Sequence, residues 1–179
     1  MPDQFKEMFA NDPPEIHPWK ANTRKGYLKT LIQYMKLTCT PQNKELKGKP
    51  ANETTQEVLD YLEDASSNFK GSGYVLTLDN LTKMLKLYNA CSQAKIPVII
   101  SGESGMGKTH LIDYLASVVL GDEFKCVTID AGLSLKKFVQ KMETYIELAR
   151  SFDSKKVRDN RDSIKKVWIL LDEFNTSSL

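Results

Sequence analysis

Apolar residues along the chain follow two patterns, helical spacing and short runs. Apolar positions three and four residues apart predict amphipathic helices, at residues 19–39, 54–70, 77–91, directly after Thr109, and at 134–152. Short runs rich in apolar residues predict strands, at Ile96–Ile100, Lys125–Ile129 and Val167–Leu171. In the second half of the chain strands and helices alternate, which is typical of an α/β fold with a parallel sheet.

The first part of the chain shows only the helical pattern. Residues 1–18 predict a short helix with a proline-rich turn, and the polar residues 40–53 predict a linker. Thr54 or Thr55 is the expected N-cap of the helix that follows. No residue here belongs to a catalytic or binding motif. We therefore expect two regions: an α-helical N-terminal region, residues 1–73, and an α/β domain, residues 74–179.

Several residues of the second half have specific structural roles in this prediction. Thr77 and Ser134 are expected N-caps and Gly121 an expected C-terminal cap, because hydroxyls satisfy amides at a helix start and glycine adopts left-handed backbone at a helix end. The apolar stripe of the helix that Ser134 begins predicts core packing. Cys126 is expected to be a buried apolar residue. The mixed-charge residues 153–166 predict an exposed loop, with at most a weak helix.

Composition limits the class of protein. The 179 residues are 41% hydrophobic and 27% charged, with a net charge of +2, which is typical of a soluble globular protein. The balanced charge argues neither for nor against a nucleic-acid partner, but the sequence has no concentrated basic patch, so we expect none. Cys39, Cys91 and Cys126 have neither metal-site nor disulfide-framework spacing, so we expect a reducing compartment. The sequence has no apolar run of membrane-spanning length and no signal peptide, so we expect a cytoplasmic protein without a membrane span.

The segment Gly102–Thr109, GESGMGKT, lies between a predicted strand and a predicted helix. It matches G-x-x-x-x-G-K-[ST], a phosphate-binding loop whose glycines let backbone amides point at a phosphate; the alternative is a chance glycine-rich turn, which the strand–helix context disfavours. Lys108 is expected to contact the outer phosphates, and the Thr109 hydroxyl to bind Mg²⁺. The expected nucleotide-binding residues are Gly102, Glu103, Ser104, Gly105, Met106, Gly107, Lys108, Thr109 and His110.

Two carboxylates, Asp172 and Glu173, directly follow the run Val167–Leu171. Because this run is apolar at every position, it predicts a strand buried on both faces, and ligands bind at the carboxyl ends of parallel strands. Asp172 is expected to bind Mg²⁺, and Glu173, acting with Lys108 in catalysis, to activate water for attack on the terminal phosphate. A kinase does not need the second acid, so the pair favours ATP hydrolysis. Asn175 is either a phosphate sensor or a turn residue.

Two stretches resemble a known family. Tyr74–Leu115 and Trp168–Leu179 look like the first AAA+ module of mysterin-type giant RING-finger E3 ubiquitin ligases, which have a dynein-like AAA+ core. The more specific features are YVLT with Asp79–Asn80 before the loop, and DEFNTSS after the last strand. The resemblance implies a P-loop NTPase (AAA+) parallel sheet flanked by helices, Mg²⁺ and ATP as ligands, and other AAA+ modules of the same parent chain as partners. Ligase activity is implied for the parent protein only, since the three scattered cysteines form no zinc module.

The resemblance also implies that the strand with the phosphate loop and the strand with the acidic pair are not neighbours, because a later strand inserts between them. We therefore expect a truncated sheet, with a gap or mispaired strands, in a piece of a longer protein that binds ATP weakly by itself and hydrolyses none. Two other functions stay open. One is a nucleotide-binding switch without turnover, which would not need Glu173. The other is a different machine, such as a dynein-like motor; the balanced charge disfavours a helicase.

Overall fold

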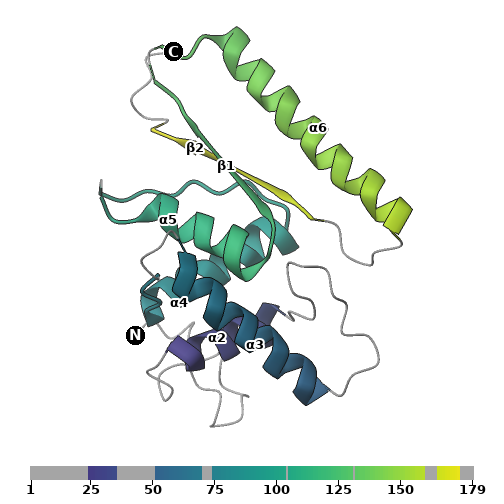
Figure 1. The fold of residues 1–179 in the computed structure, drawn as a ribbon. Coiled ribbons are helices and arrows are strands. Elements are labelled where there is room, and N and C mark those ends of the chain that lie inside the picture. Colours follow the sequence, from purple (N-terminus) through teal and green to yellow (C-terminus); the bar gives the residue numbers. More distant parts are fainter. Residues whose placement is uncertain are drawn as a thin grey trace. The chain divides into compact units, whose positions relative to one another are not determined.

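The computed structural model (Figure 1) describes residues 24–35, 51–69, 74–103, 105–130, 132–159 and 165–173. Backbone contacts divide the chain into two units, residues 1–40 with 44–101 and residues 41–43 with 102–179. The helix predicted at residues 1–18 and most of the linker predicted at 40–53 lie outside the described residues.

The first unit is helical. α2 (Arg24–Met35) packs against α3 (Ala51–Asn68) and α4 (Leu78–Leu87), and α4 continues into a π-helical segment, η2 (Tyr88–Gln93). These helices form where apolar residues recur at helical spacing, and burial of their apolar faces stabilises them. The fully buried apolar side chains of this unit include Leu28, Leu31, Val58, Leu59, Leu62, Leu81 and Met84.

The helix starts confirm one predicted cap and correct another. Thr77 has extended backbone, and its hydroxyl oxygen accepts the N–H of Asn80 at 3.2 Å, so it caps α4 as predicted. α3 begins at Ala51, and the expectation that Thr54 or Thr55 would cap it was wrong. Alanine and glutamate favour the helix, so the residues before the threonines extend it by one turn.

The predicted strand Ile96–Ile100 forms no strand in the structure. Its side chains are largely exposed, Ile99 by 96% and Ile96 by 56%. Extended backbone becomes a strand only when a neighbour supplies hydrogen-bond partners, and no described segment pairs with this one. Pro97 has no backbone N–H to contribute to such a pairing.

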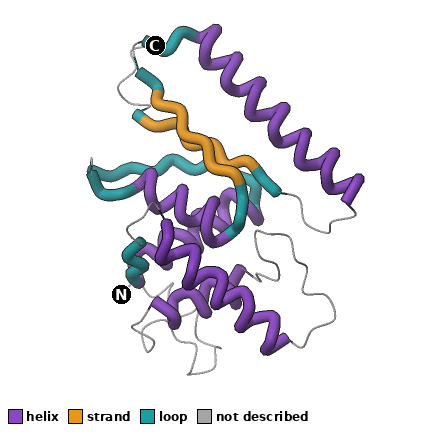
Figure 2. Tube along the Cα trace, in the orientation of Figure 1, coloured by secondary structure: helices purple, strands orange, loops and turns teal. Residues whose placement is uncertain are grey.

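In the described part of the second unit, two parallel strands pair, β1 (Glu123–Thr128) and β2 (Val167–Asp172). α5 (Lys108–Asp113) and its π-helical continuation η3 (Tyr114–Val119) precede β1, and α6 (Leu135–Asp159) lies between the strands in sequence. Figures 1 and 2 show the two strands between α6 and the α5–η3 helix. Both strands and both helices are where the hydrophobic pattern predicts them, within two or three residues at most ends.

The ends of these helices carry the predicted residues. Gly121 follows η3 with a φ of 67°, the left-handed backbone expected after a helix. The Ser134 hydroxyl accepts the N–H of Lys137 at 3.4 Å, as an N-cap does. The core of this unit is the contact of η3 with β1, where Tyr114 and Val127 are fully buried.

α6 and β2 are more exposed than the sequence predicted. The α6 stripe expected in a core is largely open to solvent at Leu135 (77%), Val139 (44%) and Ile146 (49%). β2 is not buried on both faces, since Ile169 is 42% and Leu171 38% exposed. A helix of 25 residues is about 37 Å long, whereas two strands of six residues cover about 20 Å by 10 Å. The sheet is therefore too small to cover the helix. α6 also continues to Asp159, through half of the predicted loop.

Candidate functional site

The loop before α5 depends on glycine for its backbone conformation. Gly105 and Gly107 have φ values of 79° and 73°, in the left-handed region that other residues rarely adopt. An added Cβ would meet no atom within 4 Å at either position, so conformation rather than space requires glycine. Gly107 is also the N-cap of α5 and supplies no side-chain cap, which leaves the first amides of the helix for a ligand.

Lys108 holds the loop closed on itself. Its ammonium group donates to the carbonyl oxygens of Gly102 and Glu103, both at 2.7 Å. The side chain from the first turn of α5 therefore lies against the start of the loop, and the loop folds around the positive charge. An ammonium group has three N–H donors, so two bonds to the loop leave one for an anion.

Thr109 and Asp172, far apart in the sequence, meet in space. The Thr109 hydroxyl donates to Oδ2 of Asp172 at 2.9 Å, and the pair is partly buried. Thr109 is in the first turn of α5, which packs against β2, and Asp172 is the last residue of β2. The carboxyl end of β2 therefore lies next to the end of the loop that precedes α5.

Two further donors hold the Asp172 carboxylate. The N–H of Glu173 donates to Oδ1 at 3.0 Å, and the Cys126 sulfur lies 4.0 Å from Oδ2 as a weak thiol donor. Cys126 is exposed, so the prediction of a buried apolar residue was wrong. The sequence missed this contact because it depends on pairing: the register places Cys126 opposite Leu170, two residues before Asp172 and on the same face of the sheet.

Glu173 follows Asp172 with a strained backbone. Its φ is 58°, a left-handed conformation that costs a residue with a Cβ about 1–3 kcal/mol. The conformation ends β2 abruptly, and the Glu173 side chain is exposed. Strain of this kind is found most often at functional sites.

The other predicted residues are spread over the loop and beyond it. Met106 is 69% exposed and His110, in the first turn of α5, is exposed. Ser104 and Asn175 lie outside the described residues. The structure thus brings together Gly102, Glu103, Lys108, Thr109 and Asp172, and it places Glu173 directly beside them in the chain.

A hydroxyl and a carboxylate at this separation suit a small, hard cation. Mg²⁺ binds oxygen ligands in an octahedron at about 2.0–2.1 Å, so two adjacent ligand oxygens are about 2.9 Å apart. Thr109 Oγ1 and Asp172 Oδ2 are 2.9 Å apart. The described residues contain no cluster of three or more His, Cys, Asp or Glu that could hold a metal. Mg²⁺ does not require one, since it keeps several waters and takes only one or two protein carboxylates.

Comparison with known proteins identifies the relatives of the chain. A family model described as "RNF213 AAA domain" matches residues 74–178. E3 ubiquitin-protein ligase rnf213-beta of Danio rerio is 33% identical over 109 residues, 58% of this chain and 2% of the relative. E3 ubiquitin-protein ligase RNF213 of Mus musculus is 33% identical over 108 residues, with the same coverage, and RNF213 of Homo sapiens 31% over 106 residues, 57% of this chain and 2% of the relative. No solved structure matches the chain significantly.

The chain thus spans about 2% of the length of these relatives. Within the described ranges, no helix has both the length and the apolar character to cross a membrane. The matched residues contain the loop Gly102–Thr109, both strands and the pair Asp172–Glu173, and the family agrees with the resemblance found in the sequence. The chain belongs to the RNF213 AAA-domain family.

Proposed function

We propose that residues 74–179 are a P-loop NTPase domain of the AAA+ type that binds and hydrolyses Mg-ATP, and that residues 1–73 are a helical region preceding it. The observation that carries the proposal is the 2.9 Å contact between Thr109 and Asp172. It joins the end of the loop to the end of a parallel strand, the two positions from which a nucleotide-bound Mg²⁺ is held. The family match, which begins at residue 74, supports the same division.

In this proposal the loop binds the phosphates and two oxygens hold the metal. Backbone amides of the loop and of the first turn of α5 point at the β- and γ-phosphates, and Lys108 neutralises part of their charge. Thr109 and Asp172 would hold Mg²⁺, and the ion would supply positive charge that stabilises the charge developing during transfer. The position of Lys108 supports its role in phosphate binding, because two carbonyl oxygens at 2.7 Å already hold its ammonium group at the loop.

Hydrolysis requires a base for the attacking water, and we assign Glu173 to it. The water oxygen attacks the γ-phosphorus, the bond to the bridging oxygen breaks, and ADP leaves with that oxygen. The proton of the water passes to the Glu173 carboxylate. The position of Glu173, one residue after the proposed metal ligand and at the carboxyl end of β2, supports the assignment.

We further propose that this module works in the cytoplasm, within a larger ubiquitin ligase whose other AAA+ modules are its partners. The names of the relatives support the ligase, since each is an E3 ubiquitin-protein ligase. The RNF213 AAA-domain match supports the nucleotide-dependent part of the proposal.

Binding is tested on the 179-residue chain with a fluorescent ATP analogue. Lys108→Ala is expected to weaken binding about 10-fold or more, because a hydrogen bond to a charged group contributes about 1.5–3 kcal/mol. Lys136→Ala, at an exposed position of α6, removes the same charge outside the site and should leave binding unchanged. Equal affinity of the Lys108→Ala variant and the wild type would contradict a phosphate-binding loop.

Hydrolysis is tested in the longer protein that contains the module. Glu173→Gln is expected to retain ATP binding and to lower turnover about 100-fold or more, the usual contribution of a positioned general base. Glu143→Gln, at an exposed position of α6, is the matched control. Unchanged turnover in the Glu173→Gln variant would favour the alternative, a module that binds nucleotide as a switch.

A further inference from the structure

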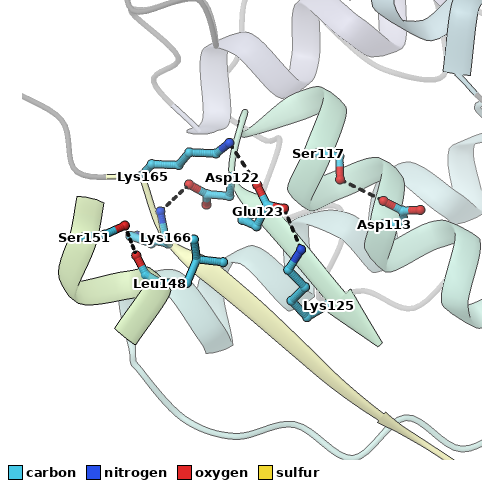
Figure 3. A network of polar contacts seen from close by, with 9 residues as sticks. All are labelled: Asp113, Ser117, Asp122, Glu123, Lys125, Leu148, Ser151, Lys165 and Lys166. Carbon is cyan, nitrogen blue, oxygen red and sulfur yellow. Dashed lines mark hydrogen bonds and ion pairs between the residues drawn. The ribbon is translucent and has the colours of Figure 1, made fainter. Parts of the chain in front are cut away.

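A partly buried carboxylate joins three elements at the amino ends of the two strands. Asp122 lies directly before β1, and both of its oxygens accept hydrogen bonds from β2 or the residue before it. The N–H of Lys166 donates to Oδ1 at 2.8 Å, and the indole N–H of Trp168 donates to Oδ2 at 2.9 Å. The backbone N–H of Asp122 donates to the carbonyl oxygen of Ala116 in η3 at 2.8 Å. Figure 3 shows the contact between Asp122 and Lys166.

Burial and the neighbouring donors act on the pKa of Asp122 in opposite directions, and burial has the larger effect. Burial raises the pKa of Asp122, and the hydrogen bonds from Lys166 and Trp168, with the positive charges of Lys166 and Lys165, oppose that rise. The adjacent carboxylate, Glu123, is occupied with lysines, Lys125 at 2.8 Å and Lys165 at 3.2 Å, as Figure 3 also shows. Asp122 is therefore the carboxylate of this cluster that contacts the backbone and the indole rather than ammonium groups.

The contacts of Asp122 are compatible with one alignment of the strands. Glu123 lies opposite Val167 and Thr128 opposite Asp172. A slip of one residue would turn every side chain of β2 to the other face of the sheet, and a slip of two would move Asp172 by about 6.6 Å. Either slip would take the Trp168 indole away from Asp122, and either would break the 2.9 Å contact of Asp172 with Thr109.

We propose that Asp122 is a positioning residue: by holding Lys166 and Trp168 it sets the register of β2 on β1 and so places Asp172 against Thr109. It acts along five residues of strand, about 17 Å. The effect of Asp122 on Mg-ATP binding rests on the proposed function, whereas its effect on the strand register does not. Asp122 then matters to the metal site without being near it.

The experiment compares Asp122→Ala and the milder Asp122→Asn, which keeps one acceptor oxygen, with the control Glu143→Gln at an exposed position of α6. Register is read from amide hydrogen exchange at Ile129, whose N–H donates to the Asp172 carbonyl oxygen at 2.9 Å. Exchange at Leu115, fully buried in η3, reports loss of stability of the whole unit. Binding of a fluorescent ATP analogue is measured with Mg²⁺ and with EDTA.

Asp122→Ala is expected to speed exchange at Ile129 about tenfold or more while Leu115 changes less, and to abolish the Mg²⁺-dependent part of nucleotide binding while metal-free binding remains. Asp122→Asn should be intermediate and Glu143→Gln unchanged. Equal acceleration at Ile129 and Leu115, or an unchanged Ile129, would overturn the proposal. A wild-type chain that binds no nucleotide, with Ile129 still responding to Asp122→Ala, would contradict the proposed function and leave the positioning role intact.

Discussion

The contact between Thr109 and Asp172 gives the sharpest test of the site. Thr109→Val removes the hydroxyl and keeps the shape of the side chain, whereas Thr109→Ser keeps the hydroxyl and removes a methyl group. A hydrogen bond to a charged group contributes about 1.5–3 kcal/mol, and because this pair is only partly buried we expect the lower end of that range. Loss of the hydroxyl also removes one of the two protein oxygens proposed to hold Mg²⁺.

The assay is a titration of Mg²⁺ into the chain with a fluorescent ATP analogue, for the wild type and both variants. Thr109→Val is expected to raise the Mg²⁺ concentration at half-saturation about tenfold, the factor that corresponds to 1.4 kcal/mol. Thr109→Ser should stay within about threefold of the wild type. Binding in EDTA should be similar in all three proteins, because the loop amides and Lys108 are unchanged.

A double-mutant cycle separates this contact from a general loss of stability. Thr109→Val and Asp172→Asn are made singly and together, and the coupling free energy is obtained from urea unfolding without nucleotide. Coupling of about 1 kcal/mol or more is expected for a direct hydrogen bond to a carboxylate. Additive effects in the cycle, or a serine variant as impaired as the valine variant, would refute the assignment of the Thr109 hydroxyl to this contact and to the metal.

Two further predictions concern stability. The side-chain hydrogen bond from Lys125 is the main cause that lowers the pKa of Glu123, so Glu123 should contribute stability above its unfolded-state pKa and lose it as the pH falls through the lower folded-state value. Urea unfolding from about pH 6 to pH 3 should therefore show a smaller acid loss in Glu123→Gln, and equal slopes would contradict the pairing. Ile99→Ser should change the unfolding free energy by less than about 0.5 kcal/mol, because Ile99 is 96% exposed. Leu81→Ala, at a fully buried position, should cost about 2–5 kcal/mol, and comparable losses in the two variants would show that Ile99 is packed.

Elements with a strong local pattern were predicted closely. Thr77 caps α4 because its hydroxyl needs only the amide three residues later, and Gly107 takes left-handed backbone because no other residue does so at low cost. These features depend on neighbours along the chain. The loop before α5 and the order of α5, β1, α6 and β2 were also predicted from neighbours along the chain.

Predictions of burial failed where they depended on a partner. The run Ile96–Ile100 and the stripe of α6 have the sequences of buried elements, yet Ile99 and Leu135 are exposed. A strand forms only with a neighbour that accepts and donates its backbone hydrogen bonds, and a helix stripe is buried only by a surface wide enough to cover it. The residues of a strand or helix do not specify whether a neighbouring strand or a covering surface is present, so they could not predict whether Ile99 or Leu135 is buried.

By itself, the sequence determined the loop, its Lys108 and Thr109, and the strand that ends in Asp172, because the spacing of residues within one strand or turn decides their local conformation. Only the tertiary structure decided that Thr109 and Asp172 lie 2.9 Å apart, that Cys126 faces the same carboxylate, and that Asp122 holds Trp168. These contacts depend on the register of two strands separated by a helix of 25 residues. The physical reason is that register arises from pairing across the sheet, and a strand contains no information about its alignment until its neighbour is in place.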